Sequence, residues 1–149
     1  MYAKINNSNV VLEYPVNIFT VHPNVSFPVG WTGGTVDGNK YVLVAPTNVP
    51  EVPHTQTVAE GTPTLTNGEW VQVWTTTAAS AEVVAQRVSD KWVQVRQQRN
   101  GLLAACDWTQ LSDSPLSTAA KTSWQTYRQA LRDVTLQSNP FQLTWPTAP

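Results

Sequence analysis

The fold of the second half of this chain is decided by residues 80–106, which read SAEVVAQRVSDKWVQVRQQRNGLLAAC. Spacings of four, four, three, seven and four residues place a set of apolar side chains on one helical stripe: Val84, Val88, Trp92, Val95, Leu102 and Cys106. Ser80 is a suitable N-cap, and Glu82 lies near the positive end of the helix dipole. We therefore predict one amphipathic helix over residues 81–105, about 37 Å long at 1.5 Å per residue.

A second helix is expected to begin at Ser117, after the helix-breaking sequence Asp113-Ser114-Pro115. Alternating spacings of four and three predict its packing seam: Ala120, Trp124, Tyr127, Leu131 and Val134. Two such helices, joined by a linker of about ten residues, favour an antiparallel hairpin. The tail over residues 139–146, with apolar residues in alternation, is expected to be extended.

The first half of the chain favours short strands. Fourteen of the 20 valines and seven of the 11 prolines lie in residues 1–79, a composition that disfavours long helices. Tyr2–Ile5 and residues 10–14 flank an Asn-rich turn and predict one hairpin. Residues 64–66 and 69–76 flank Asn67-Gly68 and predict a second hairpin with a type I′ turn.

Three further segments complete the expectation for this half. Residues 40–45 are predicted as a strand that is entered through a glycine-rich loop over residues 33–38. Residues 46–63 contain four prolines and are predicted as an extended surface segment. The predicted class is therefore α+β, with a Pro- and Thr-rich β domain over residues 1–79 and a helical-hairpin domain over residues 80–149.

The charge of the chain limits the classes of partner. Only 13% of residues are charged, and the formal net charge is −1. Residues 1–79 carry a net charge of −3 and residues 80–149 one of +2. This balance disfavours binding to nucleic acid or to anionic lipid, because both need a surplus of Lys and Arg. No apolar run is long enough for membrane insertion. A neutral polar surface of Thr, Asn and Gln instead favours a component of a larger assembly, with homo-oligomerisation left open.

Catalytic and metal-binding motifs are not found in the sequence. His22 and His54 each stand beside a proline in an expected loop, and we assign them surface or turn roles. Cys106 lies on the apolar stripe and is expected to be a small core residue, and a single cysteine excludes an internal disulfide. A glycosidase-like pair of Asp107 and Asp113 is disfavoured, because no cleft-like pattern surrounds them. We therefore expect a non-enzymatic protein without cofactors.

Polar and aromatic side chains instead gather in the helical half. Arg128 and Arg132 are one helical turn apart, so both can point toward the loop that carries Asp107 and Asp113. One interpretation is that these groups clamp the hairpin; the other is that they form a partner-binding face. The candidate residues are Arg96, Arg99, Asn100, Asp107, Trp108, Asp113, Trp124, Tyr127, Arg128, Arg132, Asp133 and Trp145.

The same region carries an ordered motif. Residues 95–116 read VRQQRNGLLAACDWTQLSDSPL, residues 124–133 read WQTYRQALRD, and Trp145-Pro146 follows. This order resembles the bacteriophage tail assembly chaperone family over residues 92–146. Tyr2-Ala3-Lys4-Ile5 and other short runs in the first half look like the region that precedes this module in tail-fibre-associated phage proteins.

The resemblance implies a phage protein that binds a tail-fibre or related tail subunit and assists its assembly in the host cytoplasm. Retention in the virion tail stays open, as does the alternative of a permanent fibre or baseplate adaptor. A third hypothesis is binding of a host receptor or glycan by surface tryptophans such as Trp31, which lies near Gly33-Gly34.

Overall fold

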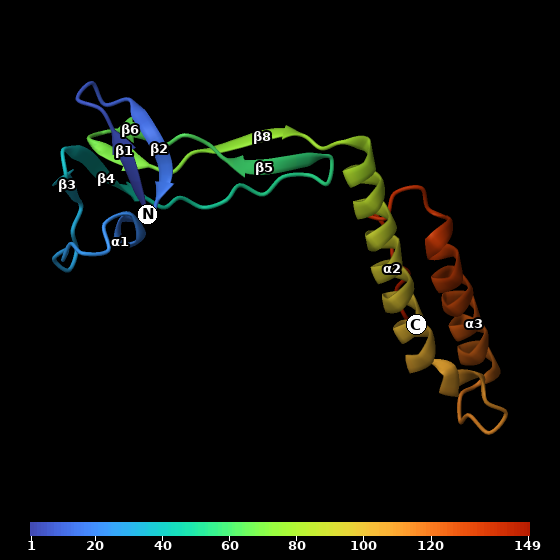
Figure 1. The fold of residues 1–149 in the computed structure, drawn as a ribbon. Helices are drawn as coiled ribbons and strands as arrows, with labels where there is room; N and C mark the ends of the chain where they lie inside the picture. Colours follow the sequence, from blue (N-terminus) through green and yellow to red (C-terminus); the bar gives the residue numbers. More distant parts are fainter. The chain divides into compact units, whose positions relative to one another are not determined.

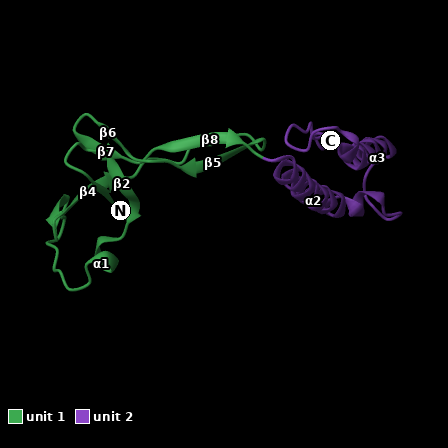
Figure 2. Cartoon of the chain, turned by 45° about the horizontal axis from the view of Figure 1, so that its top comes forward, with its two compact units in different colours: residues 1–79 green, residues 80–149 purple.

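The computed structural model describes all residues 1–149, which divide into two compact units, residues 1–79 and residues 80–149 (Figure 2). All strands lie in the first unit, and the two long helices lie in the second (Figure 1). The predicted mixed α and β class, with strands first and helices after them, is confirmed.

Six strands of the first unit form one sheet in the order β2-β1-β4-β7-β6, and β3 also pairs with β4. Only the pairing of β4 with β7 is parallel. Because β1 and β3 pair with the same residues of β4, they occupy its opposite edges. The strands are β1 (Tyr2–Ile5), β2 (Val11–Val16), β3 (Gly33–Val36), β4 (Asn39–Ala45), β6 (Thr64–Thr66) and β7 (Glu69–Val71).

Two tight turns are formed by pairs of residues with positive φ. Asn67 and Gly68 have φ of 50° and 86°, as a type I′ turn requires, and connect β6 to β7. Asp37 and Gly38 have φ of 48° and 76° and connect β3 to β4 in the same way. The expectation of a loop over residues 33–38 is therefore wrong. The Asp-Gly pair is a hairpin turn, and Gly33 supplies a strand position where a Cβ would lie 2.5 Å from the carbonyl oxygen of Tyr41.

Both faces of this sheet carry apolar clusters. One cluster is formed by Ala3, Ile5 and Val44. The other is formed by Val16, Tyr41 and Ile18, the first residue of a short helix α1 (Ile18–Val21) that Asn17 caps. Alternation along β1 and β4 explains this arrangement, since successive side chains of a strand point to opposite faces.

Two strands form a separate ribbon, β5 (Gln56–Glu60) paired with β8 (Trp74–Ala78). Their existence corrects two expectations. The predicted strand over residues 69–76 is broken at Gln72 and Val73, because the chain leaves the main sheet after β7 and pairs with β5 instead. The segment 46–63 is not extended surface throughout, since it contains β5.

The second unit is built from helix α2 (Ala81–Ala105) and helix α3 (Thr118–Asp133), which lie side by side (Figure 1). Ser80 and Ser117 cap them through hydrogen bonds from the main-chain nitrogens of Val83 and Ala120, at 3.3 and 3.2 Å. Both starts agree with the sequence prediction. Neither helix is both long and apolar enough to cross a membrane.

Two short 3-10 helices follow the long ones: η1 (Asp107–Gln110) after α2 and η2 (Val134–Leu136) after α3. The tail then turns, and residues 143–149 after the turn are neither helix nor strand. The side chain of Gln137 exchanges two hydrogen bonds of 2.9 Å with the main chain of Thr144. This turn brings Trp145 against the core of Cys106, Tyr127 and Leu131.

Candidate functional site

Arg128 is at the centre of the polar site in the second unit. From α3, its Nη1 donates to the carbonyl oxygen of Leu103 at 2.8 Å and to the Sγ of Cys106 at 3.1 Å. Its Nη2 donates to Oδ1 of Asp107 at 2.7 Å. We call these four residues the Arg128 clamp. It joins α3 to the last turn of α2 and the first residue of η1.

The position of the clamp has a physical reason. Leu103 lies in the last turn of α2, where carbonyl oxygens lack helical partners and the helix dipole is negative. The guanidinium of Arg128 donates a hydrogen bond to this carbonyl oxygen, and its positive charge is favourable at the negative end of the helix dipole. Burial lowers the pKa of Arg128, but its hydrogen bonds to Asp107 and Cys106 outweigh burial and raise it overall. The side chain is thus a permanent cation.

Thr109 supports the clamp from η1 and was not singled out from the sequence. Its side chain is fully buried, and its Oγ1 donates to the carbonyl oxygen of Cys106 at 2.6 Å. Gln110 Nε2 donates to the same Oγ1 at 2.8 Å. Threonine is seldom fully buried, so the residue type does not predict the burial of Thr109. Only its place in the DWTQ motif marks this position in the sequence. Cys106 is buried, as predicted.

Aromatic side chains line the same end of the helix pair. The ring of Trp124 lies 5.6 Å from that of Tyr127 in an edge-to-face arrangement and 6.4 Å from that of Trp108. Tyr127 is buried, Trp124 and Trp145 are half-buried, and Trp108 is 48% exposed. Trp108 and Leu111 therefore present an apolar surface next to a well-packed core.

The remaining candidates divide into two groups. Arg99 reaches Thr135 of η2 at 3.4 Å and holds the Oδ1 of Asn100, while Asp133 accepts from Gln129 at 2.9 Å. These contacts are structural. The structure gives no ion pair or hydrogen bond to the side chains of three exposed residues: Arg96, Asp113 and Arg132. Both arginines were expected to point toward the loop that carries Asp107 and Asp113, and of the four possible pairs the structure has only that of Arg128 with Asp107.

The first unit contains two polar arrangements that the sequence did not reveal. His22 is buried, with Nε2 3.0 Å from the hydroxyl of Tyr41 and Nδ1 3.0 Å from Asp37. His22 is therefore not a surface residue, but it does stand at a turn, since its carbonyl oxygen accepts from the main-chain nitrogen of Val25 at 3.2 Å. Burial, and next the nearby charges of Glu13 and Asp37, raise the pKa of Tyr41. Asp37 and Tyr41 are 15 and 19 residues from His22, so no local sequence pattern predicts these contacts.

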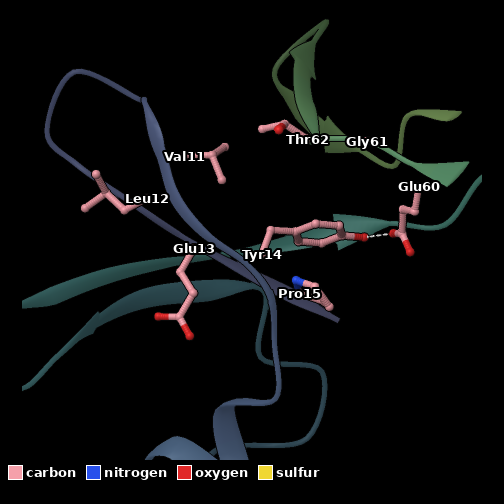
Figure 3. Close-up of a pocket in the computed structure, with 8 residues that line it drawn as sticks. All are labelled: Val11, Leu12, Glu13, Tyr14, Pro15, Glu60, Gly61 and Thr62. Atoms are coloured by element: carbon pink, nitrogen blue, oxygen red, sulfur yellow. Dashed lines mark hydrogen bonds between the residues drawn. The ribbon is translucent and has the colours of Figure 1, made fainter. Parts of the chain in front are cut away.

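The other arrangement lines a hollow of about 510 Å³ beside β2 (Figure 3). The hydroxyl of Tyr14 donates to Glu60 at the end of β5, and Gln72 donates to the same carboxylate at 2.6 Å. Burial and this hydrogen bond raise the pKa of Tyr14 to about 12, while the two donors lower the pKa of Glu60. The contact ties the ribbon to the main sheet.

No group of three or more His, Cys, Asp or Glu side chains is arranged to hold a metal ion. The Arg128 clamp can hold two helices rigidly and present Trp108 beside them.

Comparisons with known proteins bear on the same part of the chain. No curated protein and no solved structure matches it. A family model described as phage tail assembly chaperone protein matches residues 92–149, which include the clamp, all the tryptophans of the helical unit and the folded-back tail. Over residues 92–149 the chain is therefore similar to the phage tail assembly chaperone family, as the motifs in that region indicate.

Proposed function

We propose that this protein binds a subunit of a phage tail, a tail-fibre chain or a related tail part, and assists its folding and assembly without catalysing a reaction. The family match over residues 92–149 supports the role in tail assembly. The contact surface that we assign to this role consists of Trp108, Leu111 and Trp124.

The observation that carries the proposal is the exposure of Trp108. It is 48% exposed although it lies 6.4 Å from Trp124, whose ring packs on the buried Tyr127. Tryptophan beside a rigid core is the type of residue that most often dominates binding energy. The Arg128 clamp fixes η1, and hence the position of Trp108, before a partner binds, which lowers the entropic cost of association.

The proposal is tested by expressing the tail-fibre subunit of the same phage with and without this protein. We expect soluble, correctly trimeric fibre only in the co-expressed sample. Trp108→Ala, which we expect to fold, should reduce the yield, whereas Val29→Ala, a fully exposed residue of the first unit, should not. Equal yields of trimer with and without the protein would contradict the proposal.

A second candidate function is a permanent adaptor of the tail fibre or baseplate. The ribbon of β5 and β8 favours it, because most of its side chains are exposed and each strand is paired on one edge only. An added strand from a neighbour can extend such a ribbon. Purified virions distinguish the two: presence in stoichiometric amounts supports the adaptor, and loss before maturation supports the chaperone.

The packing of Trp31 does not favour the third hypothesis, binding of a host receptor or glycan. The ring of Trp31 packs 5.2 Å from that of Tyr2 and 4.7 Å from that of Phe27, and Gly34 lies against its edge. A glycan stacks on a free ring face, and these contacts leave Trp31 little of it.

A further inference from the structure

A shallow polar hollow of about 590 Å³ lies beside the Arg128 clamp, between η1 and α3. Its lining residues have no carboxylate among them: Gln110, Gln125, Thr126, Arg128, Gln129 and Arg132. A hollow with two guanidinium groups and three side-chain amides is built to receive an anion or a strongly polar chain.

The two arginines differ in what they already bind. Arg128 gives its donors to Leu103, Cys106 and Asp107, so its charge is largely compensated. Arg132 is one helical turn further along α3, is exposed, and has no partner in the structure. Its five N–H donors are available, in the planar fork that matches a carboxylate.

The glutamines supply the complementary half of the hollow. Gln129 gives its Nε2 to Asp133 at 2.9 Å, and Gln110 gives its Nε2 to Thr109 at 2.8 Å. These bonds leave the amide oxygens of both side chains as acceptors without an intramolecular donor. Main-chain N–H groups of an extended peptide are suitable donors for them.

We infer that the hollow binds an acidic side chain, Asp or Glu, on an extended segment of the tail subunit, with the carboxylate on the Arg132 guanidinium. The inference rests on the proposed binding of a tail subunit and names the chemistry of the bound segment. Charge complementarity carries it: residues 80–149 have a net charge of +2, and Arg132 has no carboxylate partner, since Asp107 bonds Arg128 and Asp133 bonds Gln129.

The test is a titration of the full chain with short peptides. Binding is monitored by NMR through the Nε–Hε signals of the arginines of the protein. One peptide has a central glutamate and an amidated end, the second has glutamine in its place, and the third has this glutamine and a free terminal carboxylate. We expect saturable shifts of the Arg132 signal with the glutamate peptide alone, weakened by added salt. Arg132→Gln should reduce the affinity about tenfold, and Arg132→Lys should restore only part of it.

Lys91→Gln is the matched control, because it removes the same charge from α2 outside the hollow, and we expect unchanged affinity. Equal binding of the glutamate and glutamine peptides, or binding of the third peptide only, would overturn the inference. So would equal affinity of wild type and Arg132→Gln for the isolated tail-fibre subunit. If the wild type binds no tail subunit, the proposed function fails, and the peptide series still decides the chemistry of the hollow.

Discussion

Arg128 of α3 donates to the carbonyl oxygen of Leu103 in α2 at 2.8 Å, and this bond closes the helix pair at the end where the chain leaves α2. A cation there stabilises the negative end of the helix dipole and adds a charge-assisted bond to a carbonyl oxygen that also accepts from the main-chain nitrogen of Cys106 at 3.2 Å. The same side chain carries the ion pair with Asp107. The clamp thus combines a main-chain contact with an ion pair.

Removal of the guanidinium should therefore matter more than removal of the carboxylate. We expect Arg128→Ala to lower the free energy of unfolding of the helical unit by about 2 kcal/mol, because it leaves a charge-assisted bond unmade. Asp107→Asn should cost less than about 1 kcal/mol, because that carboxylate is 65% exposed and screened by solvent. Urea unfolding followed by helical circular dichroism measures both, with Arg96→Ala as the exposed control.

The loss of unfolding free energy on substitution by alanine should increase with the burial of the apolar side chain in this unit. Leu131 is fully buried, so Leu131→Ala should cost about 3 kcal/mol. Trp124 is half-buried, so Trp124→Ala should cost about 2 kcal/mol, and Trp108→Ala less than about 1 kcal/mol. A loss at Trp108 as large as that at Leu131 would mean that Trp108 is a core residue and not a contact surface.

Two glycines should respond to alanine in opposite directions. Gly101 lies inside α2, and an added Cβ would meet nothing within 4 Å, so Gly101→Ala should stabilise the helical unit by about 0.5–1 kcal/mol. Gly33 has a φ of 131°, and its Cβ would lie 2.5 Å from a main-chain oxygen, so Gly33→Ala should destabilise the first unit by about 2 kcal/mol or more. Thermal unfolding of each variant checks both signs.

The raised pKa of Tyr14 predicts a loss of stability at alkaline pH. The neutral hydroxyl is favoured in the folded state, so its contribution is complete below pH 10, the ordinary pKa, and is lost as the pH rises toward 12. The stability advantage of wild type over Tyr14→Phe should vanish across this interval. Tyrosinate absorbance supplies a second readout: Glu60→Gln should bring the Tyr14 pKa closer to 10, and an unchanged titration would refute the link.

The helical unit was largely predictable from sequence because its determinants are local. Ser80 and Ser117 fix the helix starts, and the apolar spacings fix the face that contains Tyr127 and Leu131. The fold-back of the tail was not predictable, because Trp145 reaches the core only through the turn that Gln137 and Thr144 close.

The first unit was less predictable because its determinants are distant in sequence. Asn67-Gly68 specifies a turn by itself, but the break at Gln72 depends on β8 pairing with β5. By contrast, Asp107 could be predicted from the sequence as a partner of Arg128, since it lies in the linker between the two helices. The burial of His22 was not predicted, since it depends on Tyr41 in the sheet.

The central claim is that the protein recognises an unassembled tail subunit through Trp108 and its neighbours. The most direct measurement is the affinity of the full chain for the isolated tail-fibre subunit and for the finished fibre, for wild type and Trp108→Ala. We expect wild type to bind the isolated subunit at least about tenfold more tightly than Trp108→Ala does, and to bind the finished fibre weakly. Equal affinity of the two proteins for the isolated subunit would contradict it.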